Sequence, residues 1–274
     1  MTEFKPWHSY GDFERSIKRT ARFIHSSEVQ SFLRAVLATA GKRTRTIEPK
    51  GFLWRAQLGH VLEPYYQGKD YVDDVPAPLP PERMVPVRDR ATDGRANPKG
   101  IPYLYLATKR DTALAEVRPW IGSLITVGQF RIKRRLKLIN CTIGDPKEWV
   151  LPERELPPKK REETVWAQID KAFARPVSPS DDTADYVPTQ VLAEFFRTNG
   201  FEGIGYRSSL GTGHNIVLFD IDAVELTTRL LLELRSMNFE FREAFTPYFV
   251  RRQPQPKTAS HRRQRMRARR SGSG

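Results

Sequence analysis

Apolar residues recur along this chain with two different periods, and the order of those periods limits the fold. Residues 27–40, SEVQSFLRAVLATA, carry one apolar stripe at helical spacing. The same period predicts helices near 13–24, 162–174 and 189–199. Shorter apolar runs predict strands near 52–56, 103–107, 124–132, 136–143, 202–206 and 215–219. Helices and strands do not alternate regularly, so we expect an α+β fold with a mixed sheet.

Local patterns predict where some elements begin or break. Ser27 and Gln30 have the spacing of a capping box at the start of the first apolar-striped helix. Thr108 is placed to cap a short helix that we expect to begin at Lys109. Between residues 73 and 98 prolines and turn-forming residues are frequent, which predicts an irregular loop over the surface.

The composition excludes several classes of protein. No apolar run approaches the roughly 18 residues that a membrane-spanning helix needs, and the N-terminal residues do not form a secretory signal. A single cysteine, Cys141, cannot form an intramolecular disulfide. The five histidines lack ligand spacing, and the phosphate-loop, zinc-protease and serine-hydrolase motifs are absent. We therefore expect a cytoplasmic protein with no membrane partner and no metal site built by the protein.

The stretch PYLYLATKRDTALAE predicts a strand followed by a short helix, with polar residues at critical places. Strand alternation puts Tyr103 and Tyr105 on one face and two leucines on the other. Glu116 falls in the last turn of the helix, where the helix dipole disfavours a carboxylate. A surface ion pair with Arg118 or Lys109 is one explanation for this placement, and a functional carboxylate is the other.

Five short motifs follow one another along the chain. They are Arg95-x-Asn97-x-x-Gly100, Tyr103-Leu-Tyr105-Leu-Ala107, Ala113-x-x-Glu116, Gly203-Ile-x-Tyr206-x-Ser208-Ser209 and Asn215-x-x-Leu218-Phe219. Their order and approximate spacing resemble those of the RES domain family, which is named for its arginine, glutamate and serine. The resemblance runs from about Phe52 to Asp220, and Tyr186-x-Pro188-Thr189-Gln190 is similar to a motif of longer members.

This resemblance implies a fold like that of the ADP-ribosyltransferases, with an N-terminal helical extension in this chain. It also implies an enzyme that consumes NAD⁺ by phosphorolysis or hydrolysis of the nicotinamide–ribose bond, with inorganic phosphate as the co-substrate in the first case. Many members act as toxins that a DNA-binding antitoxin holds in check, so an antitoxin protein is an expected partner.

The chemistry of the implied reaction suits the residues at the matched positions. Cleavage of an N-glycosidic bond passes through a ribose cation, which Glu116 would stabilise. The planar fork of an arginine binds two phosphate oxygens at once, and Arg95, followed by Arg55, is the candidate for the pyrophosphate. Tyr105 would cover the nicotinamide ring, and the Ser208 hydroxyl would orient the nicotinamide or its ribose.

Each candidate also has a structural explanation. Arg55 could bond backbone carbonyls, Arg95 could be an exposed loop charge, and Tyr105 could be a core aromatic residue with a satisfied hydroxyl. Asn215 is equally suited to contact NAD⁺ or to begin a strand. Tyr103 is expected to pack in the core rather than to bind a ligand.

Two other functions remain open at this stage. An ADP-ribosyltransferase would attach the ADP-ribose to a protein or nucleic acid, and labelled NAD⁺ would then leave its label on a macromolecule. A non-enzymatic nucleic-acid-binding protein would use its basic tail on an inactive scaffold. Retention of Arg95, Tyr105, Glu116 and Ser208 argues against the inactive scaffold.

The charge distribution separates a tail from the rest of the chain. Nine Lys or Arg residues and no acid lie in 251–274, and removing them lowers the net charge from +14 to +5. The tail is poor in apolar residues, which predicts a disordered arm that is solvated or loosely attracts nucleic acid, with a specific binding role as the alternative. We expect four segments: N-terminal helices in 1–48, an RES-like NAD-binding catalytic domain in 49–222, a C-terminal packing segment in 223–250 and this basic tail.

Deletion of residues 251–274 is expected to leave NAD⁺ turnover and melting temperature nearly unchanged, because a disordered arm adds few buried contacts. Any DNA or RNA binding by the full-length protein should fall sharply on deletion and should weaken steeply with salt. Turnover is to be compared between the two proteins at matched ionic strength. A large drop in the truncated protein would contradict the expected boundary.

Overall fold

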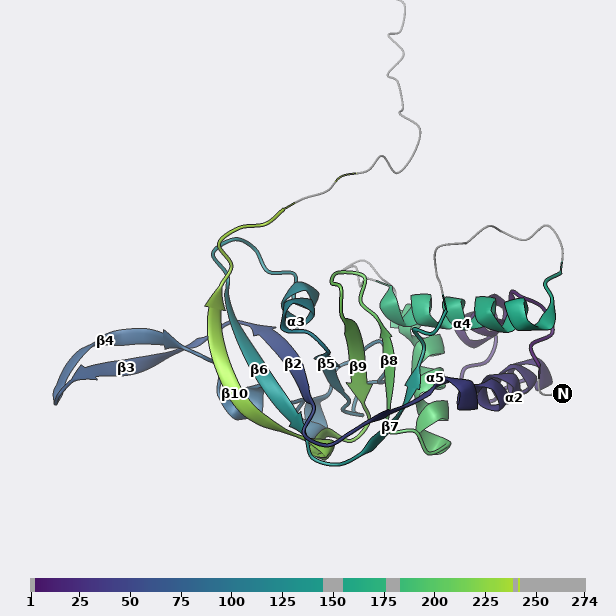
Figure 1. Ribbon diagram of the computed structural model, residues 1–274, viewed down its shortest axis with the longest axis horizontal. Coiled ribbons are helices and arrows are strands. Elements are labelled where there is room, and N and C mark those ends of the chain that lie inside the picture. Colours follow the sequence, from purple (N-terminus) through teal and green to yellow (C-terminus); the bar gives the residue numbers. More distant parts are fainter. Residues whose placement is uncertain (1–2, 145–154, 176–182, 239–240, 242–274) are drawn as a thin grey trace, which may run out of the picture. The chain divides into compact units, whose positions relative to one another are not determined.

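The computed structural model describes residues 3–144, 155–175, 183–238 and 241 (Figure 1). By its internal contacts the chain divides into two units, Met1–Met237 and Asn238–Gly274, and the sheet and helices belong to the first. The expected basic tail and the end of the expected 223–250 segment lie outside the described residues. No helix among the described residues is long and apolar enough to cross a membrane.

An eight-stranded sheet forms the centre of this unit, in the order β1-β7-β8-β9-β5-β2-β6-β10. Within it β7 and β8 run parallel, and the other neighbouring strands are antiparallel. The strands are β1 (Thr44–Ile47), β2 (Phe52–Leu58), β5 (Leu104–Ala107), β6 (Leu124–Ile132), β7 (Leu136–Asn140), β8 (Gly203–Arg207), β9 (His214–Leu218) and β10 (Val224–Glu233). The expected α+β fold with a mixed sheet is confirmed.

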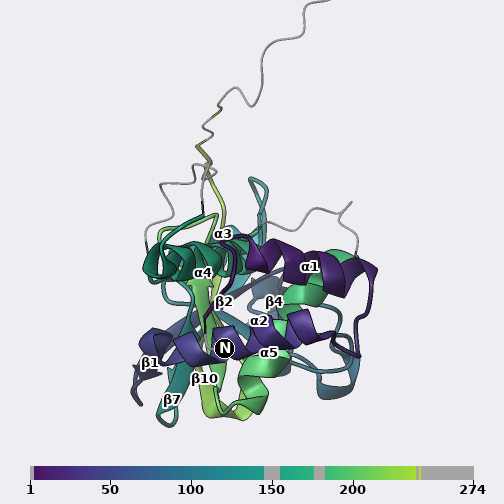
Figure 2. The same ribbon diagram turned by 90° about the vertical axis from the view of Figure 1, so that its right-hand side faces the viewer.

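Four helices gather over the part of the sheet that contains β7, β8 and β9 (Figures 1 and 2). They are α1 (Ser9–Arg19), α2 (Ser27–Ala40), α4 (Pro158–Ala174) and α5 (Val187–Thr198). Their apolar faces meet in one core, where the rings of Phe13 and Phe32 stack with centroids 4.6 Å apart. The predicted 27–40 helix is confirmed, but Ser26 rather than Ser27 caps it, since its Oγ accepts from the Val29 amide.

The opposite face of the sheet carries a second core. Leu104 and Leu106 of β5 belong to it, whereas Tyr103 lies in the helix-side core and Tyr105 packs against that core, so the predicted strand alternation is confirmed. Tyr103 is buried, with its ring 4.8 Å from that of Phe219, as its expected packing role requires. The remaining helices are α3 (Arg110–Glu116) and the 3-10 turns Gly41–Arg43, Pro81–Arg83, Arg88–Arg90, Thr183–Tyr186 and Ile221–Ala223.

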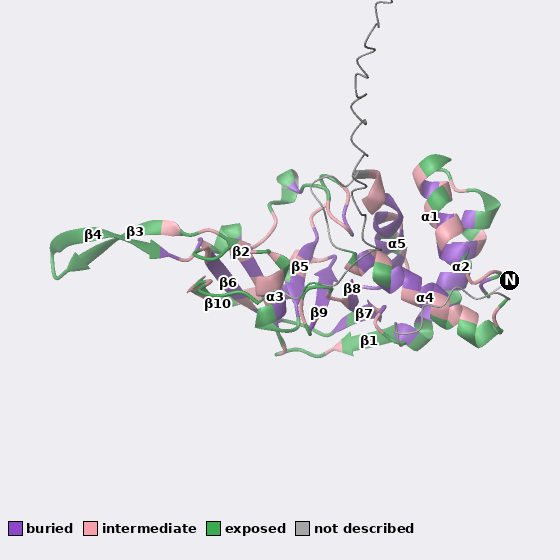
Figure 3. Ribbon diagram, turned by 90° about the horizontal axis from the view of Figure 1, so that it is seen from above, coloured by how far each residue is buried: buried purple, intermediate pink, exposed green. Residues whose placement is uncertain are grey.

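A two-stranded ribbon, β3 (Val61–Gln67) paired with β4 (Asp70–Ala77), projects from the sheet (Figure 1). Because β4 occupies residues 70–77, the predicted irregular loop between 73 and 98 is wrong at its beginning. Pro64 in β3 and Pro76 in β4 made these residues look like a loop in the sequence. An edge strand tolerates proline because one row of its backbone groups faces solvent. The ribbon is exposed along most of its length (Figure 3).

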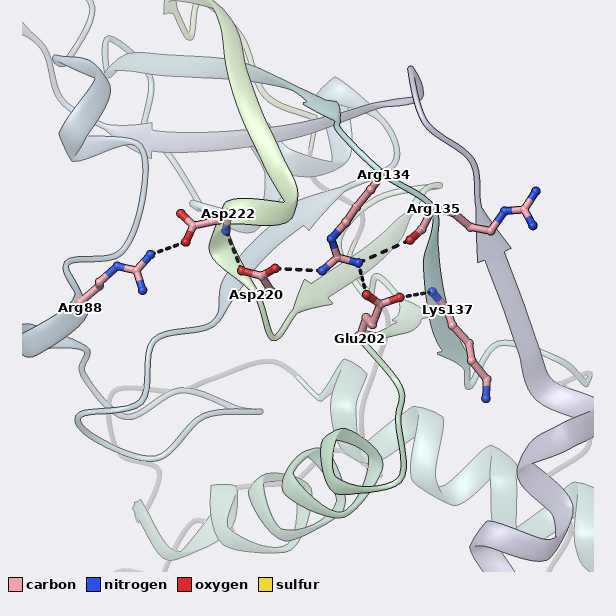
Figure 4. A network of polar contacts seen from close by, with 7 residues as sticks. All are labelled: Arg88, Arg134, Arg135, Lys137, Glu202, Asp220 and Asp222. Atoms are coloured by element: carbon pink, nitrogen blue, oxygen red, sulfur yellow. Dashed lines mark hydrogen bonds and ion pairs between the residues drawn. The ribbon is translucent and has the colours of Figure 1, made fainter.

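A polar network braces one end of the sheet (Figure 4). Arg134, in the turn between β6 and β7, donates to Glu202 and to Asp220, the latter at 2.9 Å. Glu202 also accepts from the Lys137 amide at 2.8 Å. These contacts fix the beginning of β8 and the end of β9, which leaves the other ends of these two strands for the polar residues of the sequence motifs.

A buried ion pair joins α4 to the far end of β8. Asp170 accepts from the Arg207 backbone amide at 3.0 Å and from its guanidinium at 2.5 Å. The same guanidinium donates to the carbonyls of Thr142 and Gly144. The Asp170 side chain is 4% exposed, and burial raises the pKa of its carboxyl while the contacts with Arg207 oppose that rise.

Replacement of Asp170 by alanine is expected to lower the free energy of unfolding by about 3–5 kcal/mol, because it leaves the Arg207 guanidinium without its buried counter-ion. Chemical denaturation measures this change. The matched control is Glu48→Ala, which removes an exposed pair with Arg135 and should change stability by no more than about 1 kcal/mol. Equal losses in the two variants would contradict a special role for the buried pair.

Candidate active site

The carboxylate of Glu116 lies at the end of α3, where it contacts two residues from much later in the chain, Ser208 and Asn215. Its Oε1 accepts from Ser208 Oγ at 2.7 Å and from Asn215 Nδ2 at 2.7 Å. Ser208 Oγ in turn accepts from the amides of Leu210 and Gly211, both at 3.1 Å. The serine hydroxyl therefore orients the carboxylate, and both donors converge on the same carboxylate oxygen.

A close approach between α3 and the loop that joins β8 to β9 places Ser208 there. The Gly213 amide donates to Thr112 Oγ1 at 2.9 Å, and a Cβ on Gly213 would lie 2.5 Å from that oxygen. Thr108, predicted to cap α3, instead accepts from the His214 amide, and Lys109 occupies the cap position without a side-chain bond. That prediction is wrong because Thr108 supports the β9 end of the loop.

Tyr105 anchors the loop that carries Arg95. Its hydroxyl donates to Asn97 Oδ1 at 2.8 Å and accepts from the Ala96 amide at 2.9 Å. Burial raises the pKa of this phenol, which keeps it protonated and donating. A Cβ on Gly94 would lie 2.6 Å from the same hydroxyl, so the tight loop requires glycine there.

Helix α5 holds the same loop from the other side. Thr189 Oγ1 donates to the Arg95 carbonyl at 2.5 Å, and Gln190 Nε2 donates to the carbonyls of Gly94 at 2.9 Å and Asn97 at 3.1 Å. Both side chains are buried. The sequence motif that contains Thr189 and Gln190 thus positions the Arg95 loop, a role that the sequence alone did not reveal.

Two neighbouring hollows meet at this cluster. The first, of about 290 Å³, we call the ring hollow because Trp54 and Tyr105 line it together with Arg55. The second, of about 450 Å³, we call the arginine hollow, and its lining includes Arg95, Arg118 and Arg175. The residues that line both hollows are Tyr105, Glu116, Tyr206 and Asn215.

Arg55, on β2, brings a partly desolvated cation to the ring hollow. It donates from Nη1 to the Tyr105 carbonyl at 3.3 Å, while its Nε is buried with no hydrogen-bond partner. Burial lowers the pKa of this guanidinium to about 10, so it remains charged at neutral pH. None of the ion pairs between described residues includes Arg55, and a buried cation without a carboxylate partner suits an anionic ligand.

Arg95 reaches the arginine hollow along the end of α4. It donates from Nη1 to the Ala172 carbonyl at 2.9 Å, and its guanidinium carbon lies 5.4 Å from the centre of the Tyr186 ring. Arg118, two residues after Glu116, has a φ of 46°, a left-handed conformation that is unusual for a residue with a side chain. Backbone strain of this kind is frequent at functional sites.

The structure therefore brings the six sequence candidates to one place, although Arg55 and Arg95 line different hollows. The sequence motifs include Tyr206 but assigned it no role, and they did not include Trp54 beside Arg55; Tyr206 is buried on β8 and lines both hollows. Alternate residues of β8 share a face, so Tyr206 could have been deduced from its place two residues before Ser208. In the part of the chain that the structure describes, no three His, Cys, Asp or Glu side chains form a group that could hold a metal ion.

Comparison with known proteins identifies the family. A family model described as the RES domain matches residues 75–239, more than half of the chain. The chain belongs to the RES domain family. The RES match contains Arg95, Tyr105, Glu116, Ser208 and Asn215, whereas Arg55 precedes it.

One solved structure also shows similarity, and no curated protein matches significantly. It is a crystal structure of the M. tuberculosis MbcT–MbcA toxin–antitoxin complex, with 15% sequence identity and a TM-score of 0.40. The similarity covers 72% of this chain and 92% of that chain. A TM-score of this size supports no inference about activity or partner.

Tyr105→Phe tests whether the hydroxyl is a structural anchor separate from the ring. The change removes the hydrogen bonds that the hydroxyl makes with the Ala96 amide and with Asn97 Oδ1, so we expect a loss of about 1–3 kcal/mol in the free energy of unfolding. Tyr65→Phe, on the exposed ribbon, is the control and should change stability by less than about 0.5 kcal/mol. Equal denaturation midpoints would show that the Tyr105 hydroxyl does not hold the loop.

Proposed function

We propose that this protein cleaves the nicotinamide–ribose bond of NAD⁺. The observation that carries the proposal is the position of one carboxylate, Glu116, between an aromatic hollow and a hollow lined by arginines. NAD⁺ has matching chemistry, since a cationic pyridinium ring and its ribose are joined through a pyrophosphate to the adenosine half. The RES family membership supports the choice of substrate.

In the proposed complex, the ring hollow takes the nicotinamide against Tyr105, and the arginine hollow takes the pyrophosphate against Arg95. Glu116 then lies at the ribose. Ser208 and Asn215 donate to Glu116 Oε1, which fixes the carboxylate without involving Oε2, and Oε2 can accept from a ribose hydroxyl. This arrangement is prepared before the substrate binds, as electrostatic stabilisation of a transition state requires.

The proposed reaction breaks the bond between the ribose C1 and the pyridinium nitrogen. The bonding electron pair goes to that nitrogen, so nicotinamide leaves as a neutral molecule and no acid is needed to protonate it. Positive charge develops on the ribose, where the Glu116 carboxylate stabilises it. An oxygen of water or of inorganic phosphate then bonds to C1, and water loses a proton in that step.

Arg55 bears on the identity of the acceptor. Its guanidinium lines the same hollow as Glu116 and is suited to a phosphate group, either of the dinucleotide or of inorganic phosphate as a co-substrate. Incubation of the purified protein with NAD⁺, with and without phosphate, distinguishes the acceptors by their products. ADP-ribose phosphate indicates phosphorolysis, free ADP-ribose indicates hydrolysis, and label on a macromolecule indicates transfer.

Loss of NAD⁺ through such an enzyme would harm the cell that contains it, so we extend the proposal to a toxin with an antitoxin partner, as the resemblance implies. Expression of the chain should deplete cellular NAD⁺ and arrest growth. Growth arrest without NAD⁺ depletion would contradict this part of the proposal.

Glu116→Gln is expected to lower the rate of NAD⁺ cleavage by roughly 10²- to 10³-fold, because it removes the charge that stabilises the ribose cation. The amide oxygen of glutamine can still accept from Ser208 and Asn215, so the melting temperature should change little. The control is Glu225→Gln on β10, which removes the charge of an exposed ion pair with Arg131 and should retain full turnover. Unchanged cleavage by the Glu116 variant would refute the assigned role.

A further inference from the structure

A third hollow lies between the N-terminal helix and α4, and its volume is about 550 Å³. Trp7, Tyr10 and Gly11 form the wall on the α1 side, and Ala172 and Ala174 belong to the opposite wall on α4. We call it the α1 hollow. Its lining is largely apolar and aromatic, and its size is typical of a small-molecule site.

The α1 hollow adjoins the arginine hollow. Ala174, Arg175 and Ser209 line both. The arginine hollow in turn shares Glu116 and Tyr206 with the ring hollow. The three hollows therefore follow one another in a fixed order, with the arginines in the middle.

We propose that the α1 hollow binds the adenosine half of the dinucleotide. This inference rests on the proposed function, because it extends the same site by one subsite. With nicotinamide in the ring hollow and pyrophosphate in the arginine hollow, the next group along NAD⁺ is the adenosine. The order of the groups in the substrate matches the order of the hollows in the protein.

The chemistry of the α1 hollow suits a nucleoside. Trp7, which is only partly buried, offers aromatic surface to a flat base. Glu14 and Gln168 add a carboxylate and an amide, which can accept from ribose hydroxyls or from the amino group of adenine. Lys18 donates to Glu14 at 2.7 Å and also pairs with Asp185, so it offsets part of the negative charge of this wall.

Specific contacts hold α1 in place against the site. Gln168 Nε2, on α4, donates to the Trp7 carbonyl at 3.1 Å, and Lys18 bridges Glu14 to Asp185 before α5, at 2.7 Å to each. Tyr10 is buried, and burial chiefly raises the pKa of its phenol, which Arg95 and Arg175 act to lower. The hollow is thus a supported part of the structure and lies close to the arginines.

The α1 hollow also lies partly outside the segment that carries the RES match, which begins at residue 75. Its α1 wall comes from the N-terminal helical segment, to which the sequence assigned no role. The structure points to that segment as the part of this chain that selects a dinucleotide over a substrate without adenosine.

Gly11 allows a sharp test, because a Cβ built on it would meet no atom within 4 Å. Gly11→Trp should fill the α1 hollow without clashing with its backbone neighbours, and helix α1 gains from the loss of a glycine. Arg15→Trp is the matched control, since it puts the same indole one turn along α1 at a side chain that is 69% exposed. Circular dichroism and the melting temperature establish that both variants are folded.

Three measurements on the full-length protein separate the possibilities. Calorimetry measures the binding of AMP, and kinetics measure KM for NAD⁺ and for nicotinamide mononucleotide, which lacks the adenosine half. We expect Gly11→Trp to weaken AMP binding and to raise KM for NAD⁺ by at least about tenfold, because a stacked base contributes that much. KM for nicotinamide mononucleotide should not change, and the Arg15 variant should match the wild type throughout.

Equal AMP binding by wild type and a folded Gly11→Trp would overturn the subsite. If that variant does not fold, Trp7→Ala replaces it, and unchanged AMP binding in Trp7→Ala has the same consequence. A wild type that binds AMP in the α1 hollow but cleaves neither substrate would refute the proposed reaction and retain the nucleoside site. A wild type that cleaves both substrates and does not bind AMP would retain the reaction and refute the subsite.

Discussion

The buried pair between Asp170 and Arg207 is the interaction on which the site most depends. It joins α4 to the end of β8, and each of these elements supplies one side of the site. Beyond Asp170, α4 provides the Ala172 carbonyl that holds Arg95. Tyr206 precedes Arg207 on β8 and lines both hollows, and Ser208 directly follows the strand and donates to Glu116. One ion pair with a buried carboxylate therefore aligns the side of the site that carries Arg95 with the side that carries Glu116.

Much of the fold follows from periodicity in the sequence, and the exceptions have clear causes. The 27–40 helix and the 124–132 strand have the predicted bounds because each buries one regular apolar face. Strand β10 was expected only as part of an apolar packing segment, since a run such as LLLEL fits a helix or a strand equally well. The exposed ribbon carries no apolar alternation that a core would require, and so nothing in its pattern marked it as strand.

The candidate site was predictable in its residues more than in its geometry. Glu116 could be singled out because a carboxylate at the C-terminal end of a helix opposes the dipole, and the structure supplies the two donors that hold it there. Arg118 and Arg175 could not be found in this way, because an arginine after a helix looks like any exposed charge. Their grouping in one hollow depends on loops whose course is set by contacts between distant residues.

The topology of the sheet has a consequence for how the chain acquires its activity. Of the strands that pair side by side in this sheet, only β8 and β9 are joined by a short loop, and each other paired couple comes from distant parts of the sequence. Glu116 and Ser208 themselves are 92 positions apart. Chains dominated by such non-local pairing close large loops before they gain contacts, and they fold on a scale of about milliseconds to seconds. The contacts that Glu116 accepts from Ser208 and Asn215 are themselves long-range, so they form only when distant parts of the chain have come together. The proposed cleavage of NAD⁺ needs that oriented carboxylate, so it cannot precede the long-range pairing of the sheet.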